Sequence, residues 1–156
     1  MADVVGGHTG RLDDYKGGVE SIIRLRPAYY NSETLKGIEE FSHLQVTWYF
    51  HAGSPADVAL HARSPRDNPS WPATGTYVHH NHRRPARIAT SFPRLLRVDG
   101  PDLYVAELDA DAGTPVIDLV AVFEEMLPQG KVTQPSWPGE MLANYWLDAS
   151  ARPGHS

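Results

Sequence analysis

The sequence predicts a mainly β fold: a single small barrel, closed or nearly closed, with short helices. Six or seven short segments are rich in β-branched and aromatic residues, a composition typical of strands. Thirteen prolines and thirteen glycines interrupt the 156 residues, which suits short strands joined by turns better than long helices. This length allows one compact domain with its own core. We therefore expect one domain over residues 1–148 and a flexible tail over 149–156.

The most clearly predicted strand covers residues 44–51, LQVTWYFH, because β-branched and aromatic residues dominate it. Within another expected strand, 88–98, Pro93 requires a bulge or an edge position because proline has no N–H for the ladder. Asp99-Gly100 is a hairpin signal, and Asn31 is suited to cap a short helix. The other expected strands are 19–25, 75–80, 103–108 and 116–122, and a helical turn is expected at 123–127.

The charge and the missing residue types exclude several classes of function. Lysine and arginine number 14 against 19 aspartates and glutamates, a net charge of −5, which argues against gripping long nucleic acid through the overall field. The absence of cysteine excludes disulfides, thiolate zinc sites and cysteine nucleophiles. Neither a secretory leader nor a run of about 18 apolar residues is visible. We therefore expect a cytoplasmic protein without a membrane partner.

The stretch HHNHRRPARIA, residues 79–89, is unusually rich in histidine and arginine. His80 and His82 would share one face of a strand and, with a distant His51 or Asp118, could bind a transition metal. The neighbouring arginines would repel a cation, and no motif such as HExxH is present, so we predict no metal site. The arginines could instead hold a carboxylate or phosphate, or the stretch could be a solvated loop. These arginines are Arg83, Arg84 and Arg87.

Two other places could carry chemistry. His51 ends the strongest strand, where it is either functional or bonded to a backbone carbonyl, and His43 has the same ambiguity. In DADAGTPVID, residues 109–118, Gly113 permits a positive φ, and the free amide groups of the Gly-Thr-Pro turn could contact a small polar ligand. Asp118 lies inside an apolar run, so it is either buried and hydrogen-bonded or functional.

These pieces occur in the order of a known family. LKGIEEFSHLQVTWYFH (35–51) and DLYVAELDADAGTPVIDL (102–119) resemble two blocks of the TrmO/TsaA-like family of S-adenosylmethionine (SAM)-dependent tRNA threonylcarbamoyladenosine N6-methyltransferases. PRDNPSWPATG (65–75) is similar to a loop that some members carry. The resemblance covers roughly residues 20–122 and implies a small, non-Rossmann, SAM-binding β barrel that is typically a homodimer.

The resemblance also implies a set of cofactor-binding residues, and it weakens in one segment. Residues 75–96 keep the family's frame but not most of its central motif; for example, His80 and His82 stand where relatives have arginine and proline. The lysine and tyrosine of the family's D-I-K-P-Y are absent after Asp118. The implied SAM-binding residues are Phe50, His51, Arg84, Pro85, Gly113, Thr114 and Pro115.

The departures bear on the reaction. The rewritten segment and the acidic net charge favour a SAM-dependent methyltransferase whose acceptor is a small molecule and not tRNA. The family's own tRNA reaction is one alternative, and a SAM-binding protein or an enzyme with other SAM chemistry is another. Methyl transfer to a weakly nucleophilic nitrogen needs a base, and histidine is suited to that role near neutral pH. The candidate catalytic residues are His51, His80 and His82.

Overall fold

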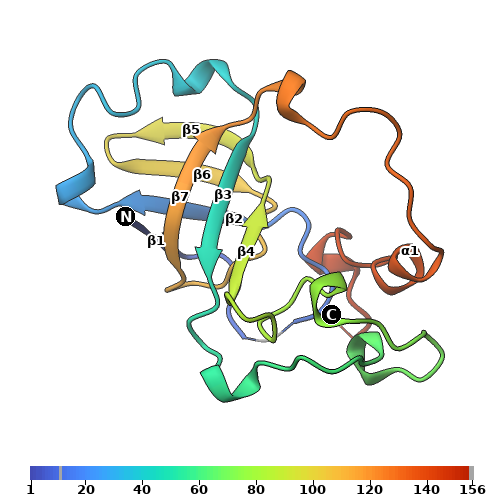
Figure 1. Ribbon diagram of the computed structural model, residues 1–156. Helices are drawn as coiled ribbons and strands as arrows, with labels where there is room; N and C mark the ends of the chain where they lie inside the picture. Colours follow the sequence, from blue (N-terminus) through green and yellow to red (C-terminus); the bar gives the residue numbers. More distant parts are fainter. Residues whose placement is uncertain (11, 155–156) are drawn as a thin grey trace.

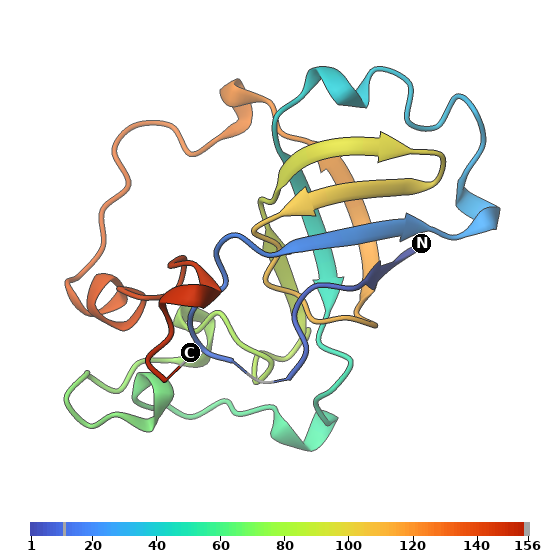
Figure 2. The same ribbon diagram turned by 180° about the vertical axis from the view of Figure 1, so that it is seen from behind.

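Seven antiparallel strands form one sheet in the computed structural model, which describes residues 1–10 and 12–154. The order across the sheet is β4-β3-β7-β1-β2-β6-β5, and Figures 1 and 2 show it from opposite sides. The strands are β1 (Ala2–Val5), β2 (Glu20–Leu25), β3 (Leu44–Tyr49), β4 (Ile88–Ser91), β5 (Arg94–Asp99), β6 (Asp102–Ala106) and β7 (Pro115–Ala121).

The sheet is strongly curled, so that β5, β6 and β2 run across the direction of β7, β3 and β4 (Figure 1). Its two edge strands, β4 and β5, are consecutive in the chain and are separated only by Phe92 and the buried Pro93. A single bridge between His43 and Arg94 ties this corner to the start of β3. The two edge strands are therefore joined by the chain at this corner and do not pair with each other in a ladder. The mainly β prediction is confirmed, but the sheet is not a fully closed barrel.

The core lies inside the curl and is built by alternation along the strands. On β3, Leu44, Val46 and Trp48 are buried while the residues between them are not, the two-residue period of a strand with one face inward. Each such aliphatic side chain contributes about 1.5–3 kcal/mol when fully buried. The core comprises Ala2, Val4, Ile23, Leu25, Leu44, Val46, Trp48, Leu103, Val105, Leu108, Ala110 and Val116.

Most strands fall where the sequence predicts them, but the single strand expected at 88–98 is divided at Phe92 and Pro93 into the two edge strands β4 and β5. The Asp99-Gly100 signal is confirmed, because β5 and β6 are joined by two residues with Gly100 at a φ of 56°. The strand expected at 75–80 is wrong, because Thr76–Val78 is a 3-10 turn. Arg63 is the physical reason: its Nη1 donates to the Thr76 hydroxyl at 3.3 Å, which holds this segment against the loop and away from any ladder. Strand β1 was not expected.

In residues 1–10 and 12–154, helical structure is limited to short pieces, as predicted. The α-helix is α1 (Trp137–Met141), and Asn31 accepts a bond from the Glu33 N–H at 2.9 Å within a turn. The 3-10 turns are η1 (Pro27–Tyr29), η2 (Ile38–Glu40), η3 (Pro55–Asp57), η4 (Pro65–Asp67), η5 (Thr76–Val78), η6 (Glu124–Met126) and η7 (Ala149–Ala151). Within the described residues, no helix has the length and apolar character needed to cross a membrane.

The segment after α1 returns to the N-terminal loop. The N–H groups of Tyr15 and Lys16 donate to the carbonyls of Asn144 and Tyr145, at 3.0 and 2.7 Å. Gly17 is required in this contact, because a Cβ there would lie 2.1 Å from the carbonyl oxygen of Trp146. This packing brings Tyr145 and Trp146 beside the sheet, where Trp146 lines the cavity described below and Tyr145 bonds to Asp109, another of its lining residues.

Candidate functional site

The end of β3 and the start of β7 lie side by side because the two strands are antiparallel neighbours, with Trp48 opposite Val116. Phe50 and His51 continue from β3, and Gly113 belongs to the turn before β7. The Nε2 atom of His51 lies 3.8 Å from the position that a Cβ on Gly113 would take. The fold thus brings together the two sequence blocks from which most of the expected cofactor-binding residues come.

The turn before β7 is fastened to β1. Gly113 has a φ of 86°, and its N–H donates to the Val4 carbonyl at 2.8 Å. The Thr114 N–H donates to the Asp111 carbonyl at 3.1 Å, and the Thr114 carbonyl accepts from the Val4 N–H at 2.9 Å. The expectation that these amide groups are free for a ligand is therefore wrong. The turn instead offers the exposed, side-chain-free surface of Gly113, while Thr114 is buried and Pro115 begins β7.

Arg87 holds the loop that follows β3. Its side chain is buried, and its Nη2 donates to the carbonyl oxygens of Phe50, at 3.0 Å, and Gly53, at 2.5 Å. The Phe50 N–H donates back to the Arg87 carbonyl at 3.0 Å, and the guanidinium lies 5.0 Å from the centre of the Tyr49 ring. A buried guanidinium bonded to carbonyls positions the backbone of Phe50 and His51.

The other arginines of this stretch are used in the same way. Arg84 donates from Nη2 to the Ile88 carbonyl, and Arg83 donates from Nε to the Asp57 carbonyl at 3.4 Å. These contacts occupy part of each guanidinium, so the stretch is neither an open anion pocket nor a solvated loop, the two readings that the sequence favoured. Pro85, the other retained residue of the central motif, is exposed at the turn between them.

The three candidate histidines differ in their surroundings. The His82 ring packs edge-on against Phe50, with centroids 6.2 Å apart, and its Nε2 lies 3.9 Å from the Asp57 carboxylate. Phe50 is therefore flanked by His82 through space and by His51 along the chain. His80 is exposed and makes no hydrogen bond or ion pair within the described part of the chain. The structure brings His51 and His82 to Phe50 but does not tie His80 to them.

Two further candidates from the sequence lie outside this cluster. Asp118 is exposed on β7 opposite Thr47. The alternative that its carboxylate is buried and hydrogen-bonded is therefore wrong. His43 is bonded through Nδ1 to the Ser42 hydroxyl at 2.7 Å, at the opposite end of β3 from His51. Across the described ranges, no group of three or more histidines and acidic residues is arranged to hold a metal ion.

A hydrogen-bonded chain beside Phe50 was not predicted from the sequence. Trp48 packs against Phe50, with ring centroids 4.6 Å apart, and its Nε1 donates to the Ser91 hydroxyl at 2.9 Å. Ser91 donates in turn to Asp109, whose other carboxylate oxygen accepts from the Tyr145 hydroxyl at 2.6 Å. Burial, reinforced by the charge of Asp109, raises the pKa of Tyr145 far above its usual value of 10.0, so the phenol remains a donor.

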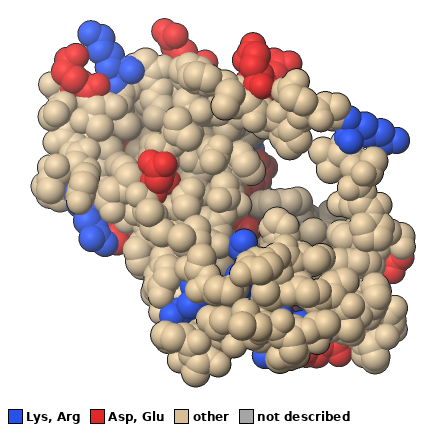
Figure 3. Space-filling model, in the orientation of Figure 1, with Lys and Arg blue, Asp and Glu red and all other residues tan. Residues whose placement is uncertain are grey.

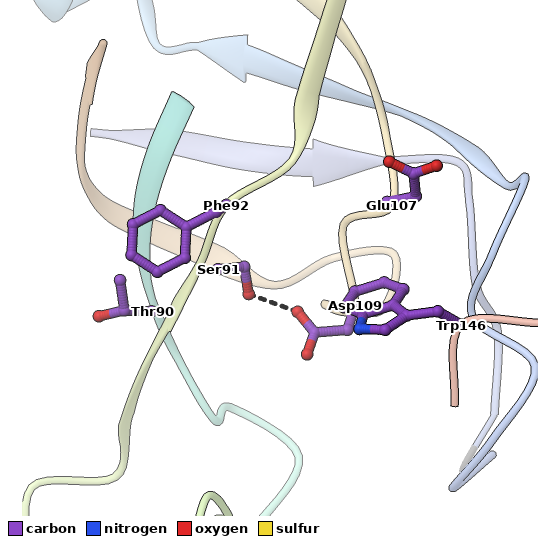
Figure 4. Close-up of a pocket in the computed structure, with 6 residues that line it drawn as sticks. All are labelled: Thr90, Ser91, Phe92, Glu107, Asp109 and Trp146. Carbon is purple, nitrogen blue, oxygen red and sulfur yellow. Dashed lines mark hydrogen bonds between the residues drawn. The ribbon is translucent and has the colours of Figure 1, made fainter. Parts of the chain in front are cut away.

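This chain of bonds borders a cavity of about 460 Å³ at the edge of β4 (Figure 4). Asp109 lies in the DADAGTP block and could have been suspected from the sequence. Ser91 and Tyr145 carry no local signal, because only the fold brings them to Asp109. The cavity is lined by Thr90, Ser91, Phe92, Glu107, Asp109 and Trp146.

Comparison with known proteins identifies the family. The model of the tRNA-methyltransferase O N-terminal domain matches residues 11–126, which is well over half of the chain. The chain therefore belongs to this family, and the resemblance noted in the sequence is confirmed.

Among its relatives, the chain is 28% identical over 115 residues to the human tRNA (adenine(37)-N6)-methyltransferase, covering 72% of this chain and 26% of that protein. It is 26% identical over 138 residues to a putative S-adenosylmethionine-dependent methyltransferase of Pseudomonas aeruginosa, covering 86% and 56%. It is 35% identical over 85 residues to a probable S-adenosyl-L-methionine-binding protein of Rhizobium radiobacter, covering 54% and 46%. The chain thus spans only part of each relative.

The fold agrees with this assignment. The crystal structure of TrmO from Pseudomonas aeruginosa superposes with a TM-score of 0.67 at 19% identity, covering 86% of this chain and 57% of that one. A second TrmO crystal structure gives a TM-score of 0.66 at 20% identity. The mainly β, non-Rossmann architecture expected from the resemblance is therefore confirmed.

Proposed function

We propose that this protein is a SAM-dependent methyltransferase of the TrmO class, with SAM bound where β3 ends beside the turn before β7. Its family, and relatives named as methyltransferases and SAM-binding proteins, support this proposal. The single observation that carries the location is the approach of His51 to Gly113, 3.8 Å from Nε2 to a Cβ position there. The open surface of Gly113 and the half-buried ring of Phe50 fit a planar nucleoside with an apolar face.

SAM supplies an activated methyl group, and the protein's task is to align the acceptor and exclude water. The Phe50 ring supplies apolar surface, and Arg87 fixes the backbone that carries Phe50 and His51. His51 and His82 flank Phe50, so either imidazole is positioned to take a proton from an acceptor nitrogen. His80, which is exposed and unbonded among the described residues, is the weakest of the three candidates. Arg84, which is bonded to the Ile88 carbonyl, and the exposed Pro85 belong to the stretch that carries Arg87.

The proposed acceptor is a small molecule. The arginines of residues 79–87 donate to carbonyl oxygens and are only partly available to phosphates, whereas nucleic-acid binding relies on exposed cations. On the face in Figure 3, acidic and basic side chains are interspersed, without a broad basic area. The net charge of −5 points the same way.

Two other functions have specific support. The human relative is named a tRNA (adenine(37)-N6)-methyltransferase, which favours tRNA as the acceptor. The Rhizobium radiobacter relative is named only as a probable SAM-binding protein, which favours SAM binding without methyl transfer, or other SAM chemistry.

A homodimer and a cytoplasmic location complete the proposal. Contact with a second copy is supported by exposed apolar side chains at Ile117, Val120 and Phe123. Sedimentation of the protein would test the dimer.

Incubation with methyl-labelled SAM and a cell extract tests the acceptor directly. We expect the labelled methyl group in a small molecule other than SAM and not in purified tRNA. Label in tRNA alone would establish tRNA as the acceptor. Label in neither fraction, with SAM bound, would support a function other than methyl transfer. Replacing His51, His80 or His82 by alanine tests the base, with His43→Ala as the matched control because His43 lies at the far end of β3. Unchanged turnover in all three variants would refute a histidine base.

A further inference from the structure

The cavity at the edge of β4 is assembled from three parts of the chain. Thr90, Ser91 and Phe92 come from β4 and the corner after it, Glu107 and Asp109 follow β6, and Trp146 comes from the segment after α1. Figure 4 shows the Trp146 ring and the two carboxylates on one side of β4, toward which the Ser91 hydroxyl points, while the Phe92 ring lies on the other side of the strand. At about 460 Å³, it has the size of a small-ligand site.

Its aromatic wall is the Trp146 ring, which is left in contact with solvent. Trp146 is 52% exposed, which is unusual for a ring that could pack inward. Trp146 is not loosely attached, because its ring meets Tyr145 edge-on with centroids 4.9 Å apart. Tyr145 is in turn bonded to Asp109. Aromatic faces held in this way attract cations through the ring quadrupole.

The polar side of the cavity carries negative charge. Asp109 is fixed by the buried Ser91 hydroxyl and by Tyr145, and a carboxylate has acceptor capacity beyond two such bonds. Glu107 has a φ of 65°, in the left-handed region that few residues other than glycine adopt. Arg94 approaches Glu107 at 3.4 Å, but the Arg94 side chain is 49% exposed and that of Glu107 is 38% exposed, so this ion pair is weak. It does not involve Asp109.

We propose that this cavity binds a small organic cation, with Trp146 contacting its apolar part and Asp109 and Glu107 balancing its charge. Two sources share this chemistry: the sulfonium of SAM, and the ammonium group of a separate small molecule. The Trp48 ring connects the cavity to Phe50 of the proposed SAM site, through its packing on Phe50 and its bond to Ser91. Assigning the cation to the reaction rests on the proposed function; binding of the cation itself does not.

Calorimetry with matched probes tests the proposal. Choline and its neutral carbon isostere 3,3-dimethylbutan-1-ol have the same shape and differ in charge. The thioether S-adenosylhomocysteine lacks both the charge and the transferable methyl group of SAM. We expect choline to bind about tenfold more tightly than dimethylbutanol, the size of a cation–aromatic contact with a nearby carboxylate. The variants Trp146→Leu and Glu107→Gln change half-exposed side chains and should fold; each should weaken choline binding several-fold. Glu125→Gln, at an exposed residue outside the cavity, is the control.

The SAM arm identifies the source. If Trp146→Leu weakens SAM but not S-adenosylhomocysteine, the cation is the sulfonium; if it weakens only choline, the cation belongs to a separate ligand. Equal binding of choline and dimethylbutanol, binding of no cation to the unmodified protein, or variants that match the control would each overturn the proposal. Failure of both SAM and S-adenosylhomocysteine to bind, with choline still bound, would refute the proposed function and leave the cation site standing.

Discussion

Arg87 and Phe50 bind each other's backbone: the Phe50 N–H donates to the Arg87 carbonyl at 3.0 Å, and Arg87 Nη2 donates to the Phe50 carbonyl at 3.0 Å. The same Nη2 reaches the Gly53 carbonyl. The loop carrying Phe50 and His51 is therefore held by a residue that lies in the most divergent stretch of the sequence. This explains how the rewritten segment can keep the geometry of the β3 end while losing the family's motif.

Replacing Arg87 by methionine should destabilise the protein by about 2–3 kcal/mol, because two carbonyls lose a charged donor in a buried place. Arg83→Met is the control, because the Arg83 side chain makes one long hydrogen bond, at 3.4 Å, to the Asp57 carbonyl. This replacement should cost less than about 1 kcal/mol. Urea unfolding of the two variants measures the difference. Equal losses of stability in the two variants would contradict the role of Arg87 in holding the loop after β3.

Tyr145→Phe removes the bond to Asp109 and should cost about 1–2 kcal/mol. Because that bond attaches the C-terminal segment to the sheet, amide hydrogen exchange should accelerate in residues 137–148 before it does so in β3. Tyr77→Phe is the control, because Tyr77 is 81% exposed. Unchanged exchange in the C-terminal segment of Tyr145→Phe would show that the segment is held by its backbone contacts alone.

His8 should make the protein less stable on mild acidification. It is buried beside Lys16, Asp109 and Asp111, and burial, followed by the charge of Lys16, lowers its pKa below the usual 6.5. The unfolded chain then takes up the proton at a higher pH than the folded one. The stability from neutral His8 is therefore full above pH 6.5 and is lost as the pH falls towards the folded pKa.

The free energy of unfolding measured from about pH 7.5 to about pH 5 tests this linkage. His8→Gln should lose less stability over this range than the unmodified protein. The control His61→Gln, at an exposed histidine, should lose as much as the unmodified protein. Asp3 and Asp102, whose pKa values are lowered by bonds to Arg26 and Arg24, titrate below 3.8 and so lie outside the window. Parallel pH profiles for His8→Gln and the unmodified protein would contradict the prediction.

Gly113→Ala should cost about 1–2 kcal/mol, because its φ of 86° is strained for any residue with a Cβ. Gly139→Ala is the matched control: it lies in α1, has no positive φ and has nothing within 4 Å of an added Cβ. It should be neutral or stabilising by up to about 1 kcal/mol, since alanine favours helix. Thermal unfolding compares them, and equal midpoints would show that the turn before β7 relaxes around a side chain.

The sequence predicted what local pattern controls. β3 and β7 follow from β-branched and apolar runs, and the β5–β6 hairpin follows from Asp99-Gly100. β1 was missed because it has four residues and is strand only through its pairing with β2 and β7. The 75–80 segment has strand-like residues, but its contact with Arg63 overrides that preference.

The arrangement of the candidate site could be predicted from the sequence only in part. Phe50, His51 and Gly113 come from blocks with a recognisable pattern, and antiparallel pairing of β3 and β7 brings those blocks together. The structural use of Arg87 was not predictable, because its partners are backbone carbonyls far away in the sequence. The same holds for Tyr145, which meets Asp109 only when the C-terminal segment has docked.

Calorimetric titration with SAM and with S-adenosylhomocysteine tests whether SAM binds where β3 ends beside the turn before β7. We expect both to bind the unmodified protein at one site, and both affinities to fall in His51→Ala and Phe50→Ala while His43→Ala binds normally. Circular dichroism of each variant would establish that the sheet is intact. Binding of neither compound to the folded, unmodified protein would contradict a SAM site in this fold.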